Sequence, residues 1–144
     1  MVIDLKKLKI QGKTEIDFFF EYEDFGELCS LPETEVLKPI KVLGKLEVVS
    51  NNSVIVSGEI NFVLSGPCSR CLEETVKEYS VSFDEDFSKD DETSYLIQND
   101  KVDLSKMVDD LVILNMPYNL LCKEDCKGIC LNCGKNLNKE NCNC

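Results

Sequence analysis

The stretch LEVVSNNSVIVSGEINFVL, residues 46–64, decides the fold. Leu46 and Val48 lead into the Asn51-Asn52 pair, and adjacent asparagines tolerate the positive φ angles of a tight turn. After that pair, apolar or small residues recur at every second position, as in a strand with one buried face: Val54, Val56, Gly58, Ile60, Phe62 and Leu64. We therefore expect a hairpin that joins two long antiparallel strands.

Two further strands are predicted on either side of this hairpin. Residues 15–22, EIDFFFEY, are rich in aromatic residues and bounded by turn formers, which suits a half-buried strand. The turn Pro67-Cys68-Ser69-Arg70-Cys71 leads into a strand with one apolar face at period two, made of Tyr79, Val81, Phe83 and Phe87. Cys68 and Cys71 are therefore expected at the tip between two antiparallel strands.

The spacing of apolar residues becomes helical after residue 100. A core helix is predicted at residues 103–115, with Asp103 as its N-cap and Pro117 beyond its end. The helix residues expected in the core are Leu104, Met107, Val108, Leu111, Val112 and Leu114. Near the N-terminus, Leu5, Leu8 and Ile10 fit either a helical turn or an edge strand.

Composition excludes several classes of protein. A chain of 144 residues with 43% hydrophobic content can bury about 70% of its unfolded surface, so a globular domain is expected. The absence of histidine excludes histidine bases and mixed Cys/His zinc fingers. Charged residues interrupt the first apolar residues, and no apolar run is long enough for a bilayer, so we expect a cytoplasmic protein without membrane contact.

The nine cysteines are unevenly placed, with six in the last 23 residues. In a reducing cytosol, thiols persist as metal ligands or redox groups rather than as disulfides. Eight of them form four close pairs, Cys68/Cys71, Cys122/Cys126, Cys130/Cys133 and Cys142/Cys144. Because Zn²⁺ takes four tetrahedral ligands, four pairs predict two zinc sites with four cysteine ligands each.

The cysteine pairs can share the two sites in two ways. In the first arrangement, pairs that lie close together in the fold or in the sequence share one site. Cys68/Cys71 then join Cys122/Cys126, and Cys130/Cys133 join Cys142/Cys144. An interleaved arrangement would instead set Cys68/Cys71 against Cys130/Cys133. We favour the first arrangement.

Four sulfurs fill the coordination sphere of zinc, so the sites are expected to be structural and the protein not to be an enzyme or to bind a small-molecule substrate. The ninth cysteine, Cys29, is expected to be a free thiol.

The predicted fold class is α+β. Residues 1–121 form a mainly antiparallel β-rich domain with one core helix, and residues 122–144 form a cysteine-rich zinc-knuckle module packed on the strand tip 67–72.

Three segments together resemble the YceD-type family of bacterial factors implicated in accumulation of large-subunit ribosomal RNA. They are Cys68-Ser-Arg-Cys71-Leu72, the helix from Asp103 with the following Pro117, and the cysteine-rich run from Cys122 to Asn138. The resemblance covers most of residues 40–144. It implies a non-enzymatic role in maturation or stability of 23S ribosomal RNA, with contact to a precursor of the large ribosomal subunit.

Charge restricts how such a protein could touch RNA. The net charge is −11, and residues 15–35 hold eight acidic residues and no lysine or arginine. Direct RNA contact is therefore confined to local basic groups. The candidates are Arg70, Lys123, Lys127, Lys135 and Lys139 near the cysteines, and Lys6, Lys7, Lys9 and Lys13 at the N-terminus.

Three functions stay open: an rRNA-accumulation factor that contacts 23S rRNA or a basic ribosomal protein, a zinc-stabilised adaptor that binds only proteins, and a thiol redox or metal-handling protein. The sequence does not predict an oligomeric state.

Overall fold

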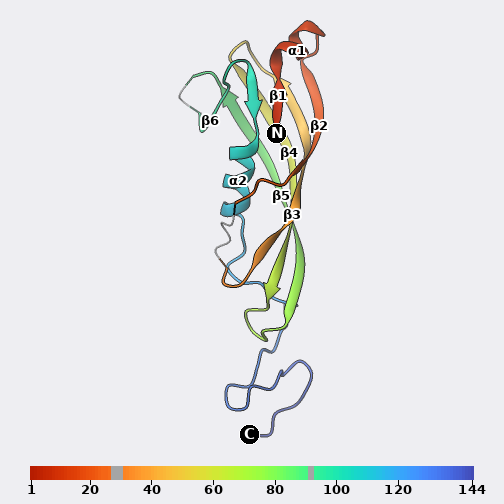
Figure 1. The fold of residues 1–144 in the computed structure, drawn as a ribbon, viewed down its shortest axis with the longest axis vertical. Coiled ribbons are helices and arrows are strands. Elements are labelled where there is room, and N and C mark those ends of the chain that lie inside the picture. Colours follow the sequence, from red (N-terminus) through yellow and green to blue (C-terminus); the bar gives the residue numbers. More distant parts are fainter. Residues whose placement is uncertain (27–30, 91–92) are drawn as a thin grey trace.

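The computed structural model describes residues 1–26, 31–90 and 93–144 (Figure 1). The expectation for Cys29 lies outside the described residues. The elements are β1 (Val2–Asp4), α1 (Leu5–Ile10), β2 (Glu15–Tyr22), β3 (Glu35–Val48), β4 (Ser53–Pro67), β5 (Glu74–Ser88), β6 (Tyr95–Leu96), β7 (Lys101–Asp103) and α2 (Ser105–Leu114). This order confirms a mostly antiparallel sheet with few helices.

The main sheet has the order β2-β3-β4-β5-β6, and all neighbours are antiparallel except β5 and β6. The predicted hairpin forms the centre of this sheet. The asparagine turn joins β3 to β4, and the ladder pair nearest that turn is Val48 with Val54. The register shifts between Leu37 and Lys41, where the β3–β4 ladder is irregular. β1 and β7 form a separate antiparallel pair.

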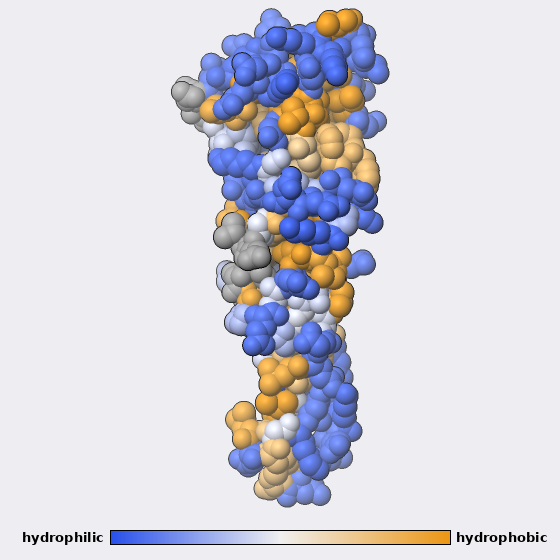
Figure 2. Space-filling view, in the orientation of Figure 1, coloured by the Kyte–Doolittle hydropathy of each residue, from blue (hydrophilic) through white to orange (hydrophobic). Residues whose placement is uncertain are grey.

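One face of the sheet is buried, as the alternation predicts. Val54, Val56, Ile60, Phe62 and Leu64 of β4 are all at most 1% exposed. Helix α2 lies beside the strands of the sheet in Figure 1, with its axis roughly along them, and contributes buried Met107, Val108 and Val112 to the same core. The space-filling view shows an elongated molecule on which polar residues separate several small apolar patches (Figure 2).

Two glycines oppose each other where β3 and β4 cross the middle of the sheet. Gly44 pairs with Gly58, and a Cβ added at Gly58 would collide with the backbone oxygen of Leu43. The strands can approach this closely because neither residue has a side chain.

The helix predictions need two corrections. Helix α2 begins at Ser105, and its N-cap position is Leu104; Asp103 instead ends β7. The Asp103 carboxylate nevertheless accepts a hydrogen bond from the Ser105 backbone N–H at 3.0 Å, as a capping side chain does. Leu114 is not in the core: it is the last residue of α2 and is 78% exposed, beyond the part of the helix that the sheet covers.

The N-terminal alternative is resolved as a helix. Asp4 caps α1 by accepting a hydrogen bond from Lys6 N–H at 2.9 Å, and Leu5 and Leu8, three residues apart, are buried on one face. Ile10 is 85% exposed.

Candidate metal centre

Cys68 and Cys71 lie at the tip of the β4–β5 hairpin. The Cys68 N–H donates to the carbonyl of Glu73 at 2.8 Å, and the Leu72 N–H donates to the carbonyl of Cys68 at 2.9 Å. These bonds close a tight turn that presents both sulfurs to one centre, which is how a zinc knuckle holds two ligands.

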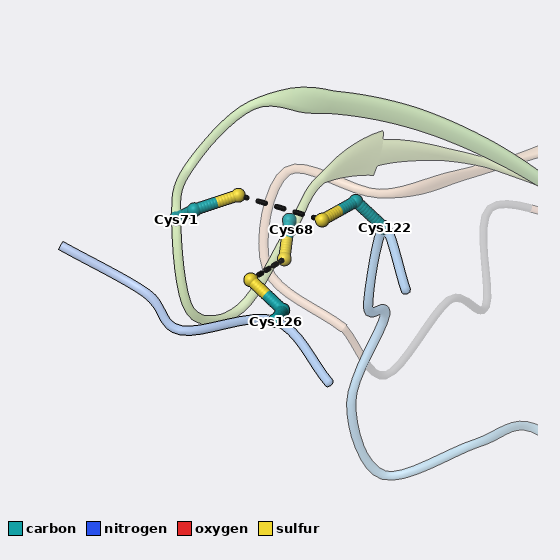
Figure 3. Close-up of side chains that lie close together, drawn as sticks. All are labelled: Cys68, Cys71, Cys122 and Cys126. Carbon is teal, nitrogen blue, oxygen red and sulfur yellow. Dashed lines mark hydrogen bonds between the residues drawn. The ribbon is translucent and has the colours of Figure 1, made fainter. Parts of the chain in front are cut away.

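The segment after α2 brings Cys122 and Cys126 to this tip (Figure 3). Ser69 N–H donates to the Leu120 carbonyl at 2.7 Å, and Arg70 Nη1 donates to the Cys126 carbonyl at 3.0 Å. The Sγ atoms of Cys68 and Cys126 are 3.8 Å apart, and those of Cys71 and Cys122 are 3.6 Å apart. All four sulfurs lie within 4.8 Å of one another.

The other four cysteines form a second group inside the C-terminal tail. Cys130 N–H donates to the Lys135 carbonyl at 2.8 Å, and Gly134 N–H donates to the Cys130 carbonyl at 2.8 Å. This turn therefore repeats the two bonds of the Cys68–Cys71 turn. Gly134 has φ +73°, and Leu72 holds the equivalent position with φ +61°.

The sulfur positions fit a tetrahedral metal ion. Metal–sulfur bonds of about 2.3 Å, as zinc forms with thiolates, place neighbouring sulfurs about 3.8 Å apart. The first group has separations of 3.6 and 3.8 Å, and the second has separations from 3.0 to 4.0 Å. A disulfide needs about 2.05 Å, and all eight described cysteines are free thiols. Each group could therefore hold a metal ion, and the sets are those of the favoured pairing rather than of the interleaved one.

The two groups differ in burial. Cys68, Cys71 and Cys126 are at most 4% exposed and form a small apolar cluster with Leu121 and Ile129, whereas Cys122 is exposed. In the second group, two cysteines are exposed and two are partly buried. The first group is thus part of the folded interior, and the second lies at the surface.

Hydrogen bonds lower the pKa values of some of these thiols, which favours their ionised form. Burial raises the pKa of Cys68, but hydrogen bonds from backbone groups of Cys122, Cys71 and Arg70 outweigh it and lower this pKa to about 6. A backbone hydrogen bond at Cys133 and the neighbouring thiols likewise lower the pKa of Cys130 to about 6.

Other thiols resist ionisation beside their neighbours. The Cys144 thiol raises the pKa of Cys142 to about 12. A cation at the centre would favour the ionised form of all four sulfurs.

Asn138 supports the first group, and the cysteine spacing did not predict its role. Its Nδ2 donates to Cys126 Sγ at 3.3 Å and lowers the pKa of that thiol. Its Oδ1 accepts a hydrogen bond from Lys127 N–H at 2.9 Å, which fixes the amide. The only signal in the sequence was its place at the end of the motif shared with the YceD-type family.

The structure separates the basic candidates into two places. Helix α1, with Lys6, Lys7 and Lys9, lies at one end of the molecule, and the C-terminal tail lies at the other (Figure 1). Several tail lysines face carboxylates: Lys123 is 3.9 Å from Asp125, and Lys135 is 3.2 Å from Glu140. Lys139 pairs with Glu73. Among the described residues Lys127 forms no ion pair, and Arg70 donates one of its nitrogens to the Cys126 carbonyl. Of the five candidates near the cysteines, these two therefore keep the most free hydrogen-bond donors.

The fold and the site define a β-rich chain with two groups of four thiols, each close enough together to hold one metal ion. The family model described as "Large ribosomal RNA subunit accumulation protein YceD" matches residues 56–144, which include both groups. The chain belongs to this family.

The similar proteins include two that are named as YceD homologues of chloroplasts. The chain is 48% identical over 44 residues to "Large ribosomal RNA subunit accumulation protein YCED homolog 1, chloroplastic" of Arabidopsis thaliana, covering 31% of this chain and 14% of that protein. It is 36% identical over 62 residues to the Zea mays protein of the same name, covering 42% and 21%. An uncharacterized protein of Mycobacterium tuberculosis is 31% identical over 105 residues, covering 67% of this chain and 50% of that protein.

The chain thus spans half or less of the length of these relatives. No solved structure matches it significantly. No helix among the described residues has the length and apolar character that crossing a bilayer requires.

Proposed function

We propose that this protein is a non-enzymatic cytoplasmic factor that promotes accumulation and maturation of 23S ribosomal RNA and assembly of the large ribosomal subunit. The observation that carries this proposal is the family match over residues 56–144, which contains the hairpin tip, α2 and both cysteine groups. The names of the two plant relatives agree with it.

Both four-cysteine groups are proposed to hold structural Zn²⁺. The ligands would be Cys68, Cys71, Cys122 and Cys126 in one site and Cys130, Cys133, Cys142 and Cys144 in the other. Bound zinc supplies positive charge that keeps the thiolates ionised, and four sulfurs leave no open position for water. In the first site the ligands come from the hairpin tip and the segment after α2, so the site would fix the tail to the sheet.

The proposed contact with the large-subunit precursor lies beside these sites. Arg70, Lys123, Lys127 and Lys135 are exposed at the tail end of the molecule, where phosphate or an acidic protein surface could reach them. The rest of the chain carries a large negative charge that repels RNA and suits a basic ribosomal protein. This charge favours, as a second candidate, a zinc-stabilised adaptor that binds proteins without RNA contact.

Depletion of the protein in its own cells tests the main proposal. We expect 23S rRNA and large subunits to fall relative to 16S rRNA, and the wild-type chain to restore them. A variant with Arg70→Ala and Lys127→Ala should restore them poorly, whereas a variant with Lys7→Ala and Lys9→Ala, which also loses two positive charges, should restore them fully. Normal 23S rRNA after depletion would contradict the proposed function.

Metal content separates the structural role of the thiols from redox chemistry. X-ray absorption of protein purified without chelator should give a four-sulfur zinc environment for two metal ions per chain. Reversible disulfides with no metal would instead support the thiol redox function.

A further inference from the structure

Among the described residues, strand β5 has an outer edge without a strand partner along most of its length. β4 pairs with one side of β5 from Glu74 to Ser88, but β6 pairs with the other side only at Phe87 and Ser88. Within the described part of the chain, the backbone of residues 74–86 hydrogen-bonds only to β4. Unpaired N–H and C=O groups in a row are a template for a further strand.

The two faces of this edge differ in character. On the core side, Tyr79 and Val81 are only partly buried, although they pack against the main core. A neighbouring strand would cover their remaining apolar surface. On the opposite side the exposed residues include four acids, namely Glu74, Glu78, Asp84 and Asp86.

Among the described residues, these four carboxylates are offset neither by ion pairs nor by charged residues across the ladder. None of them forms an ion pair there, and their partners across the ladder on β4 are the uncharged Pro67, Val63, Ser57 and Ile55. A second copy of the same edge would set acid against acid, which cross-strand pairing disfavours. The charge therefore selects a basic partner rather than a dimer.

The opposite edge of the sheet, β2, offers a natural comparison. It also carries exposed acids, Asp17 and Glu21, but these stand across the ladder from Lys45 and Lys41 of β3. The Lys45 ammonium pairs with Glu15 and Glu47. The lysines of β3 thus offset part of the acidic charge beside β2, and a basic strand would gain less there than at β5.

We propose that the β5 edge binds an extended basic segment of a partner protein, which adds to the sheet as a further strand. Successive side chains of a strand point to opposite faces, so the segment should alternate Lys or Arg, toward the acids of β5, with apolar residues toward Tyr79 and Val81. The inference deepens the proposed function and rests on it for a role in subunit assembly, because it names the class of protein that this factor holds.

A synthetic peptide tests the edge directly. The probe is a fluorescein-labelled peptide of about nine alternating lysines and valines, the length of a common strand, and the control is a peptide of the same composition with its valines consecutive. We expect the alternating peptide to bind the full zinc-loaded chain in the micromolar range and the control peptide to bind at least about tenfold more weakly, because only alternation matches the two faces.

Charge reversal at the two edges provides matched variants. Glu78→Lys with Asp84→Lys should weaken binding at least about tenfold, because two attractive cross-strand pairs become repulsive. Asp17→Lys with Glu21→Lys makes the same change in net charge on β2 and should alter affinity less than about threefold. Hydrogen exchange of residues 74–86 should slow in the complex, while that of β2 stays unchanged.

Equal weakening by both double variants, equal binding of both peptides, or no binding at millimolar concentration would overturn the proposal. Because this assay contains no RNA, its outcome is independent of the depletion experiment. Failure of the peptide to bind with loss of 23S rRNA on depletion would reject the edge alone, and binding with normal 23S rRNA would reject the proposed function alone.

Discussion

Loss of one cysteine from each of the two proposed zinc sites should affect the sheet very differently. Cys122 and Cys133 are both exposed, and each has its closest partner sulfur at a similar distance, 3.6 Å from Cys71 and 3.4 Å from Cys142. Cys122→Ser and Cys133→Ser therefore remove chemically equivalent thiols from the two proposed zinc sites. The two proposed sites differ in the number of residues in the loop that each would close.

The magnitude follows from the entropy of loop closure. Cys71 and Cys122 are 51 residues apart, for which a cross-link restricts the unfolded chain by about 4 kcal/mol. Cys133 and Cys142 are 9 residues apart, which gives about 2.5 kcal/mol. The first loop contains β5 and α2, whereas the second lies wholly inside the tail and does not constrain the sheet.

For 144 residues the entropy of unfolding is about 0.3 kcal/mol per kelvin, so we expect Cys122→Ser to lower the Tm of the sheet by about 13 °C. Cys133→Ser should lower it by less than about 3 °C, because the tail can open locally. Thermal melting followed by far-UV circular dichroism, with zinc counted by mass spectrometry, measures both effects. Equal falls in Tm, or an unchanged Tm for Cys122→Ser after loss of one zinc, would refute the reasoning.

Three further substitutions test the packing and the charges of the fold. Gly58→Ala should lower the free energy of unfolding by about 2–4 kcal/mol in urea titration, because its Cβ would collide with a backbone oxygen of β3; an unchanged value would mean that the strands separate freely there. Leu72→Gly should raise the free energy of unfolding by about 1 kcal/mol, since it removes the strain of φ +61° on a residue whose side chain is 64% exposed. A thermal melt that shows a loss of stability would contradict this interpretation of the turn. Burial raises the pKa of Asp109, so Asp109→Asn should raise the free energy of unfolding at pH 7 while still accepting the hydrogen bond from Tyr22. That gain should shrink as the pH falls through the raised pKa, because the wild-type carboxyl then becomes protonated in the fold, and a pH-independent gain would contradict this assignment.

Local patterns predicted most of the fold. The period-two alternation of residues 54–64 placed β4 and its buried face, and the helical spacing after residue 100 placed α2 with an error of two residues at its start. The same spacing wrongly predicted that Leu114 lies in the core. Periodicity identifies the apolar side of a helix, but it does not show how far the sheet extends beneath that side. For the N-terminal segment, three apolar residues were too few to separate a helix from a strand.

The sequence by itself determined the central hairpin, its cysteine tip and the four close cysteine pairs, because each depends on residues that are neighbours along the chain. Only the tertiary structure decided which cysteine pairs lie together. The hydrogen bonds from Ser69 and Arg70 to the segment after α2 join parts of the chain that are about fifty residues apart. It alone also decided that, within the described part of the chain, most of the acidic β5 edge has no further strand partner, while Asp17 and Glu21 of β2 stand across the ladder from lysines. Side-chain periodicity is a local property, but strand order and the meeting of distant thiols depend on how the whole chain closes on its core.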